Sequence, residues 1–267
     1  MIKTVAPMPT ILDLEDDDPY VALLIYARSG AGKTVFAGSD DEVLFLNTEK
    51  RGTLSAKRQG STAKKINGNT WNKCVATKNW LTELGEKDKI PYKWFVVDTL
   101  TNLQRLNMIH QISAANQNVK EKARQKSTVV PEMSDYLVNQ HELIRFVEEV
   151  NELPVNVLWL CHASIEIDED GNNYVLPAIH GKEGKIAQAI CAMQTSFGHM
   201  KVVQAEVTNP TTKKKSLVIH RDIWWIDKGS TTGKDRTGVL APKTRNLTLK
   251  QIRERIEAGP KPKVAAE

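Results

Sequence analysis

Short apolar runs recur along the chain, and each ends in polar residues. The first is Val21–Tyr26, and comparable runs occupy residues 43–46, 94–97 and 155–161. Continuous apolar runs of this length are typical of strands that are buried on both faces of a parallel sheet. Between the runs, apolar residues spaced three and four apart predict helices, most clearly at 134–151. The alternation predicts an α/β fold with a mostly parallel, twisted sheet flanked by helices.

The pattern changes in the last third of the chain, where apolar and polar residues alternate. Residues 164–175 alternate around an Asp-Gly pair, which predicts a β-hairpin. Residues 202–207 and 217–226 predict a second antiparallel pair, and Thr248 is placed to cap a short final helix. We therefore expect an antiparallel hairpin extension near the C-terminus.

Composition fits one globular domain with a mild basic charge. The 267 residues carry 37 Lys and Arg against 32 Asp and Glu, so the net charge is +5, which is compatible with nucleic acid without requiring it. No apolar run approaches membrane-spanning length, and the three cysteines lack metal-binding spacing, so we expect a cytoplasmic protein with reduced thiols. The basic segment 50–65 predicts a solvated surface more than a phosphate contact. We expect an irregular arm at 1–18, one domain at 19–258 and a flexible tail at 259–267.

The first apolar run leads into a loop of small residues that ends in Gly-Lys-Thr, the pattern of a Walker A phosphate loop. Gly30 and Gly32 let successive backbone N–H groups turn toward a phosphate, and the following helix adds the positive end of its dipole. Lys33 supplies a mobile cation to the β- and γ-phosphates, and Thr34 offers a hydroxyl to Mg²⁺. Ala27 replaces the usual first glycine of the pattern. The residues predicted to bind the nucleotide are Arg28, Ser29, Gly30, Ala31, Gly32, Lys33 and Thr34.

Two carboxylates follow later apolar runs, at positions that a parallel sheet brings to one edge. Asp98 ends the run at 94–97, which is the Walker B pattern, and we expect its carboxylate to reach Mg²⁺ opposite Thr34. Structural capping is the alternative for Asp98. Glu49 follows the run at 43–46 and is a candidate catalytic base that orients the attacking water, with a helix cap or a solvated acid as the alternative.

Taken together, Val96–Thr101, the Walker A loop and Leu44–Glu49 resemble the RecA-like ATPases over about residues 20–245. The likeness is to the compact phage-encoded branch, a reduced RecA core linked to single-strand annealing and homologous recombination. It implies a RecA-like P-loop ATPase that uses ATP and Mg²⁺ and acts on single-stranded DNA in the host cytoplasm. It also implies a homo-oligomer, as a ring or a filament, and a single-strand binding protein as a further partner. The Asn-Lys-x-Asp guanine signature is absent, which favours ATP over GTP.

Further site residues follow from the same resemblance. His162, after the fourth apolar run, stands where RecA-like ATPases have a polar residue that senses the γ-phosphate, although a lone histidine is more often structural. Lys234 and Arg236 resemble the Lys-x-Arg fingers that enter a neighbouring subunit's nucleotide site, with two solvated cations as the alternative. Residues 102–131 lie where the first DNA-contacting loop is expected. Four cations there predict phosphate contacts, or else a solvated surface: Lys120, Lys122, Arg124 and Lys126.

The predicted function is ATP-dependent handling of single-stranded DNA in homologous recombination or strand annealing. One alternative is a nucleotide-gated DNA-binding or annealing module with little turnover, which measured ATP hydrolysis with and without DNA distinguishes. Another is a motor ATPase for helicase loading or packaging, which directional strand displacement distinguishes.

Overall fold

The computed structural model describes residues 19–117, 119–121, 125–128, 130–167, 171–181, 184–208 and 215–260. Helices and strands alternate through most of these residues, and strands dominate from residue 196 to residue 245. The strands are β1 (Ala22–Ala27), β2 (Val43–Asn47), β3 (Lys64–Asn67), β4 (Trp94–Asp98), β5 (Asn156–Ile167), β6 (Asn173–Pro177), β7 (Ser196–Thr208), β8 (Lys215–Trp224), β9 (Lys234–Asp235) and β10 (Lys243–Arg245). The helices are α1 (Lys33–Ala37), α2 (Leu54–Arg58), α3 (Trp71–Gly85), α4 (Leu100–Gln117), α5 (Met133–Asn151), α6 (Lys185–Met193) and α7 (Leu249–Ala258).

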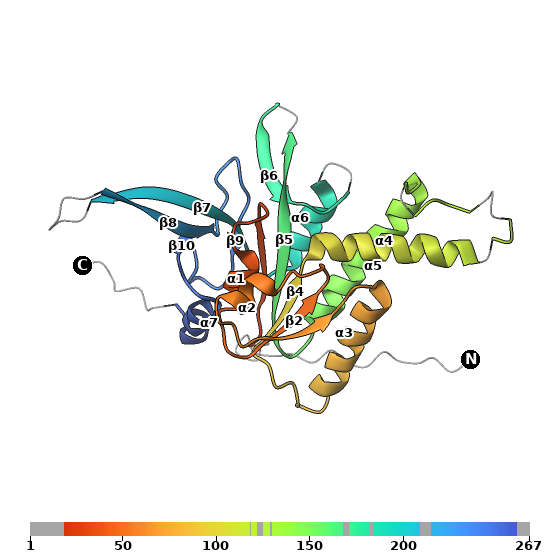
Figure 1. Ribbon diagram of the computed structural model, residues 1–267, viewed down its shortest axis with the longest axis horizontal. Coiled ribbons are helices and arrows are strands. Elements are labelled where there is room, and N and C mark those ends of the chain that lie inside the picture. The colour runs from red at the N-terminus through yellow and green to blue at the C-terminus, as the bar shows by residue number, and fades with distance from the viewer. Residues whose placement is uncertain are drawn as a thin grey trace, which may run out of the picture.

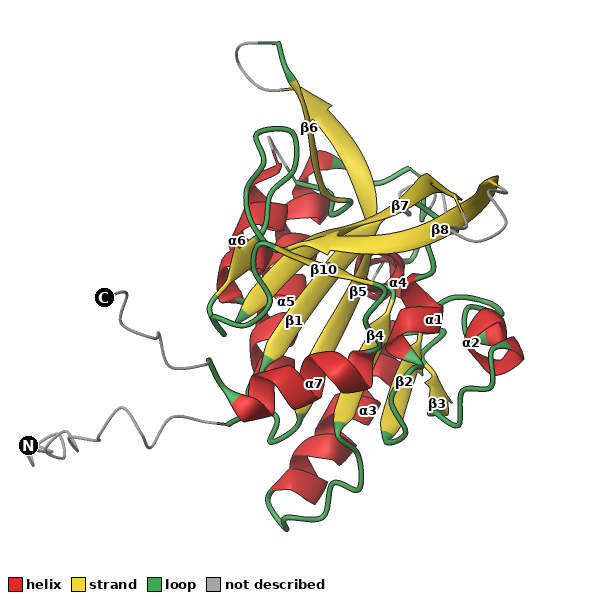
Figure 2. Ribbon diagram, turned by 90° about the vertical axis from the view of Figure 1, so that its left-hand side faces the viewer, coloured by secondary structure: helices red, strands yellow, loops and turns green. Residues whose placement is uncertain are grey.

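One twisted sheet forms the centre of the molecule, with the strand order β10-β8-β7-β1-β5-β4-β2-β3 (Figures 1 and 2). Neighbours from β7 to β3 pair in parallel, whereas β8, β9 and β10 add antiparallel pairs at the β7 side. The remaining strand, β6, pairs antiparallel with β5. The arrangement confirms the predicted α/β fold with a mostly parallel sheet and an antiparallel extension near the C-terminus.

Alternate residues of the central strands face two apolar layers. Leu24 and Tyr26 of β1 pack into the layer to which α3, α4, α5 and α6 contribute, whereas Leu23 and Ile25 pack into the layer to which α1 and α7 contribute. Figure 2 shows α1 and α7 in front of the strands. Because both faces are covered by helices, the interior positions of these strands are apolar on both faces, which explains the uninterrupted runs in the sequence.

Two long hairpins extend away from the body of the sheet (Figure 1). Strand β5 leaves its parallel partner β1 after His162 and pairs with β6 over residues 163–167. The sequence predicted that this strand begins at residue 202, but β7 begins at Ser196. Its first residues pair in parallel with β1, and the rest pair with β8. A single strand thus belongs to the central sheet at one end and to a projecting hairpin at the other.

The segment predicted to contain a DNA-contacting loop, residues 102–131, begins as a long helix. Helix α4 continues to Gln117, and Leu103 and Ile112 are fully buried in or against the core. The prediction of a loop was therefore wrong over the first half of this segment. Polar residues on α4 obscured its periodicity, since Gln104 and Asn107 are also buried and form hydrogen bonds across to neighbouring segments.

The helix predicted at 134–151 is present as α5, and its start differs slightly from the prediction. Glu132 is its N-cap, and Asp135 completes the capping box. Leu137, near the start of α5, has 62% of its surface exposed, whereas Leu143 is fully buried. Strand β3 was not predicted at all, because it lies at the sheet edge and most of its residues are exposed polar side chains.

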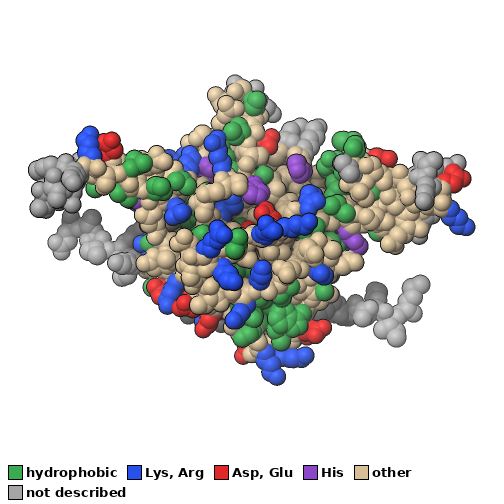
Figure 3. Space-filling model, viewed as in Figure 1, with side chains coloured by type: hydrophobic (Ala, Val, Ile, Leu, Met, Phe, Trp, Pro, Cys, Tyr) green, Lys and Arg blue, Asp and Glu red, His purple; other side chains and the backbone are tan. Residues whose placement is uncertain are grey.

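Lys and Arg side chains gather on the face of the molecule in front of α1 and α2 (Figure 3). No helix among the described residues is long and apolar enough to cross a membrane. The predicted arm at 1–18 and residues 261–267 of the predicted tail lie outside the described residues.

A buried ion pair fixes the C-terminal helix α7 to the sheet. Asp40, which is 3% exposed, accepts hydrogen bonds from Arg253 at 2.8 and 3.3 Å and from the Trp94 indole at 3.2 Å. Burial alone would raise the pKa of Asp40, but the hydrogen bonds from Arg253, the Asp41 amide and Trp94 outweigh it and hold this pKa below its usual value.

We expect Arg253→Ala to lower the free energy of unfolding at pH 7 by about 2–3 kcal/mol, because it leaves the Asp40 carboxylate buried without its cation. Since the pKa of Asp40 is depressed in the folded protein, the pair stabilises the fold above the unfolded pKa of about 4, and this stabilisation is lost as the pH falls. The deficit of Arg253→Ala should therefore shrink in acid. Urea unfolding of the parent, Arg253→Ala and the control Glu257→Ala, which removes only the exposed partner of Arg253, measures it. A deficit that stays constant down to about pH 3 contradicts this account.

Candidate active site

The strand register brings four predicted site segments to one edge of the sheet. Ala27 at the end of β1 pairs with His162 of β5, and Asp98 at the end of β4 pairs with Leu160 of the same strand. On its other side Asp98 pairs with Asn47, the last residue of β2, two residues before Glu49. The carboxyl ends of these parallel strands therefore carry the phosphate loop, His162, Asp98 and Glu49 in spatial succession.

The phosphate loop has the backbone conformation that its glycines allow. Gly30 and Gly32 have φ angles of 79° and 98°, in the left-handed region, and α1 begins at Lys33 immediately afterwards. The Lys33 side chain is only 6% exposed, and its ammonium donates hydrogen bonds to the carbonyls of Ala27 at 2.9 Å and Arg28 at 3.2 Å. Burial lowers the pKa of Lys33, whereas the nearby carboxylates raise it. The loop thus holds a buried cation whose partners are two of its own backbone carbonyls.

The Thr34 hydroxyl donates a hydrogen bond of 2.8 Å to Asp98 Oδ2. Asp98 is 2% exposed, and burial raises its pKa to about 6, with an opposing contribution from the Thr34 hydrogen bond. A buried carboxylate beside a threonine hydroxyl is a set of hard oxygen ligands, which suits Mg²⁺. The structure therefore brings together the two residues predicted to hold the metal.

Glu49 and His162 form the other half of the site. Glu49 Oε1 lies 3.1 Å from His162 Nε2 and accepts a hydrogen bond of 2.8 Å from the Thr99 hydroxyl. The hydrogen bond from His162 makes the largest contribution in lowering the pKa of Glu49, and Thr99 adds to it against the opposite effect of burial. Glu49 is thus a charged, oriented carboxylate, about one third exposed. Such a group can accept a proton from a water molecule, provided that the water lies within hydrogen-bond distance.

Threonine hydroxyls position these charged groups, and sequence reasoning did not identify them. The Thr48 hydroxyl donates to the Asp98 carbonyl at 3.0 Å and accepts from the Thr99 amide at 2.8 Å, which ties the end of β2 to the end of β4. The Thr101 hydroxyl accepts from the His162 amide at 3.1 Å and so ties α4 to β5. The signal was present, since Thr48, Thr99 and Thr101 all stand within four residues of the end of a predicted strand.

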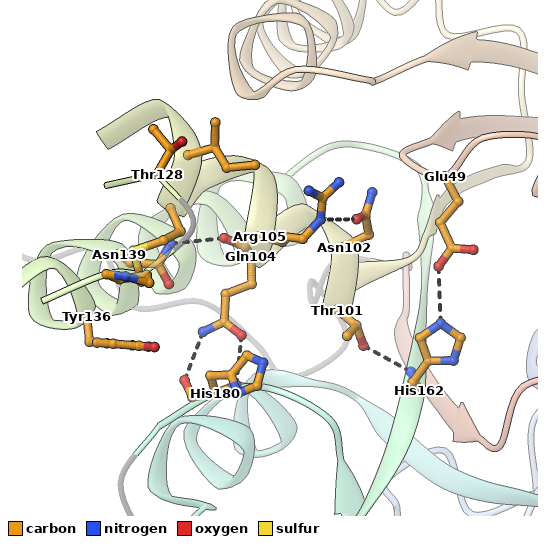
Figure 4. A pocket seen from close by; sticks show the side chains of 13 residues that line it. Glu49, Thr101, Asn102, Gln104, Arg105, Thr128, Tyr136, Asn139, His162 and His180 are labelled. Atoms are coloured by element: carbon orange, nitrogen blue, oxygen red, sulfur yellow. Dashed lines mark hydrogen bonds and ion pairs between the residues drawn. The ribbon is translucent and has the colours of Figure 1, made fainter. Parts of the chain in front are cut away.

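A cavity of about 610 Å³ opens beside Glu49 and His162 and extends between α4 and α5 (Figure 4). Gln104 crosses its floor, where its side-chain amide exchanges two hydrogen bonds with the backbone of His180. Asn139 of α5 donates to the Gln104 carbonyl at 3.0 Å. Glu49 and His162 therefore face a space that is large enough for a second ligand and lined mainly by polar groups at this end.

Arg221 of β8 is a further residue that sequence reasoning missed. Its Nε donates a hydrogen bond of 3.2 Å to the Ala31 carbonyl in the phosphate loop. The positive φ at position 32 favours glycine, and a Cβ there would lie 2.5 Å from the same Nε, so any other residue would also require the Arg221 side chain to move. No local signal could have identified Arg221, because 190 residues separate it from Ala31.

Lys234 and Arg236 lie away from the phosphate loop of their own chain. Strand β9 pairs with the first residues of β7, and the Arg236 amide donates a hydrogen bond to the Thr195 carbonyl. These residues lie near the beginning of β1, at the edge of the sheet opposite to the phosphate loop. The Lys234 ammonium donates to two carbonyls at the end of α6, at 3.0 and 3.3 Å. Arg236 is exposed. Their role as fingers in a neighbouring subunit's site stays a prediction.

The predicted DNA-contacting cluster is only partly described. Lys122 and Arg124 lie outside the described residues, and Lys120, three residues after the end of α4, is exposed. Lys126 is 2.7 Å from Asp135 and 3.0 Å from Glu132, so two carboxylates already neutralise its charge. A phosphate contact by Lys126 would have to displace these partners, and the role of the cluster in DNA binding stays a prediction.

Comparison with known proteins gives a family match. A family described as AAA domain matches residues 20–237. No curated protein sequence matches the chain. Among solved structures, an ATPase of the type III secretion system of pathogenic bacteria has a TM-score of 0.42 at 12% identity, covering 68% of this chain. The chain spans only 52% of that ATPase. The solved ATPase domain of a second protein has a TM-score of 0.38 at 12% identity, with 76% of this chain and 82% of that domain covered.

We expect Lys33→Ala to bind ATP at least ~10-fold more weakly and to lose hydrolysis, because the phosphate loop then has no cation under the β- and γ-phosphates. Nucleotide binding measured by calorimetry and phosphate release test this. Lys87→Ala, an exposed lysine elsewhere, is the matched control. Unchanged affinity and turnover in a folded Lys33→Ala protein would refute the assignment of the phosphate loop.

Proposed function

Because the chain belongs to the AAA domain family, we propose that it is an Mg²⁺-dependent ATPase that acts on single-stranded DNA in strand annealing or homologous recombination. The observation that carries the proposal is the convergence of five side chains on one sheet edge: Lys33, Thr34, Glu49, Asp98 and His162. These side chains supply a phosphate-binding cation, a set of metal ligands and a candidate base, which are the parts that phosphoryl transfer needs.

Thr34 and Asp98 would hold Mg²⁺, which would supply positive charge to offset the charge of the transferred phosphoryl group. Their oxygens already lie 2.8 Å apart, at the end of the phosphate loop where the γ-phosphate is expected. Binding of a cation favours the ionised form of Asp98, whose burial otherwise disfavours it. Lys33 would exchange its carbonyl partners for phosphate oxygens.

Glu49 would orient and deprotonate the attacking water. The Thr99 hydroxyl and the His162 ring both contact one oxygen, Oε1, which leaves Oε2 available to a water. His162 contacts Glu49 and, through its amide, the start of α4, so a change at the γ-phosphate can reach α4 and the β5–β6 hairpin by way of this residue. This supports the sensor role proposed for His162.

Single-stranded DNA as the polymer partner is supported by the net charge of +5 and by the exposed cations near the phosphate loop. A homo-oligomer is supported by the position of Arg236, an exposed cation in a loop that Asp235 holds in place. The Asp235 carboxylate accepts hydrogen bonds from Ser196, Thr237, Leu240 and Ala241. Asp235 therefore orders this loop rather than pairing with Arg236.

We expect single-stranded DNA to raise the ATPase rate of the parent protein, and double-stranded DNA and RNA to raise it less. The Glu49→Gln variant should bind ATP and DNA as the parent does while its turnover falls by about 10²–10⁴, because only the base is removed. Phosphate release with each polymer measures both effects. Hydrolysis that no nucleic acid stimulates contradicts the proposed role. A rate near zero in the parent, with nucleotide-dependent DNA binding, identifies a binding module instead.

If Arg236 acts on a neighbouring subunit, Arg236→Ala should bind ATP normally but hydrolyse it about 10³-fold more slowly. The specific activity of the parent should then rise with protein concentration. Mixtures of Arg236→Ala with Lys33→Ala should regain turnover, because one interface combines an intact phosphate loop with an intact arginine. Absence of rescue at every mixing ratio, with activity independent of concentration, would leave a monomeric ATPase.

A further inference from the structure

A set of basic residues next to Glu49 has no counter-charge in the structure. Residues 50–65 contain no Asp or Glu. The cations in this segment are all exposed, and none makes an ion pair or a side-chain hydrogen bond in the part of the chain that the structure describes. They are Lys50, Arg51, Lys57, Arg58, Lys64 and Lys65.

Several cations elsewhere on the molecule have carboxylate partners, in contrast to this set. Lys126 has two such partners, Lys250 binds Asp41, and Arg253 binds Asp40. The last two contacts matter here, because Asp40 and Asp41 are the carboxylates that shortly precede β2. Both already pair with cations of α7. Like charges held together without partners raise the electrostatic free energy of the folded state, and a polyanion would remove this repulsion.

The fold makes a concave surface from part of this segment. A cavity of about 530 Å³ is lined by Arg51, Lys57 and Lys65 together with Thr53, Ser61 and several apolar side chains. It lies against α2 and the edge strand β3, which ends the sheet order, so one side of β3 is open to a partner. Figure 3 shows Lys and Arg side chains gathered on the face that carries α1 and α2. The α2–β3 surface, defined as residues 50–65, is thus a cationic groove rather than a scattered set of charges.

We propose that the α2–β3 surface binds the phosphate backbone of single-stranded nucleic acid and that its occupancy reaches the active site through Glu49. Three cations and two hydroxyls in one groove match successive phosphates, which demand positive charge and hydrogen-bond donors but no base readout. The groove contains no exposed aromatic side chain, so base stacking makes no contribution to this contact.

The connection to the active site is covalent and short. Lys50 and Arg51 directly follow Glu49, and the turn they form leads into α2. A polymer that fixes this turn also fixes the backbone from which the Glu49 carboxylate extends toward Thr99 and His162. The proposal rests on the proposed function, in that the coupled reaction is the ATPase, but the binding contact itself does not depend on hydrolysis.

The test uses two full-length variants with equal loss of charge. Arg51→Gln, Lys57→Gln and Lys65→Gln together remove the groove cations. Lys87→Gln, Lys89→Gln and Arg255→Gln together remove three exposed cations elsewhere. Fluorescence anisotropy with labelled oligo-dT over about 50–200 mM salt gives the affinity and its salt slope. Thermal unfolding checks that both variants fold.

We expect the groove variant to lose about 2 from the salt slope and roughly 10-fold or more in affinity at low salt, since each single-strand phosphate contact contributes about 0.7 to the slope. Its basal ATPase should match that of the parent, while stimulation by oligo-dT is lost. The control variant should keep both slope and stimulation. An unchanged salt slope in the groove variant, or an equal loss in the control variant, contradicts nucleic-acid binding by the α2–β3 surface but leaves the proposed function intact. A parent that binds no oligo-dT at any salt concentration overturns both.

Discussion

The buried ammonium of Lys33 is the constraint on which the rest of the site depends. A charge with 6% exposure is costly unless oxygen atoms replace its water. Two of these atoms are carbonyls of Ala27 and Arg28, and they face the ammonium only because β1 ends at Ala27 and the chain turns back through two glycines with positive φ. The compensating negative charge comes from Asp98 and Glu49, which belong to strands or strand ends that do not touch β1.

The strand order solves the problem of bringing those carboxylates to Lys33. Strand β5 lies between β1 and β4, so Asp98 is one strand removed from Ala27, and it reaches Thr34 across the end of β5. Strand β5 itself contributes His162 at this point, and β2 leads to Glu49 beyond Asp98. The Thr34 and Thr99 hydroxyls donate hydrogen bonds to the carboxylates of Asp98 and Glu49, because a charged group in a low-dielectric site needs fixed polar partners.

The sequence predicted this edge well and its supporting contacts poorly, for a physical reason. An apolar run followed by a carboxylate, as before Asp98 and Glu49, indicates both that a strand is buried and where it ends. Both are local properties of the sequence. The pairing of Thr48 with Asp98 and of Arg221 with Ala31 depends on which strands are neighbours, which no run encodes. Helix α4 escaped prediction for the related reason that its buried face includes polar residues whose partners lie on α5 and after β6.

The sequence also does not show which cations are available to a ligand, whereas the fold shows which of them have carboxylate partners. The resemblance favoured residues 120–126 over 50–65 as the DNA contact, yet Lys126 is neutralised by Glu132 and Asp135, whereas the cations of the α2–β3 surface have no partner among the described residues. Whether a cation is available to a ligand is therefore a property of its neighbours. The position of Glu49 also depends on its neighbours. Thr99, at the start of α4, and His162, on β5, both contact its carboxylate. Its backbone leads into the cationic turn at Lys50 and Arg51. A carboxylate fixed by three segments responds to a displacement of any of them, and of these three only the cationic turn carries the charge that attracts a polyanion.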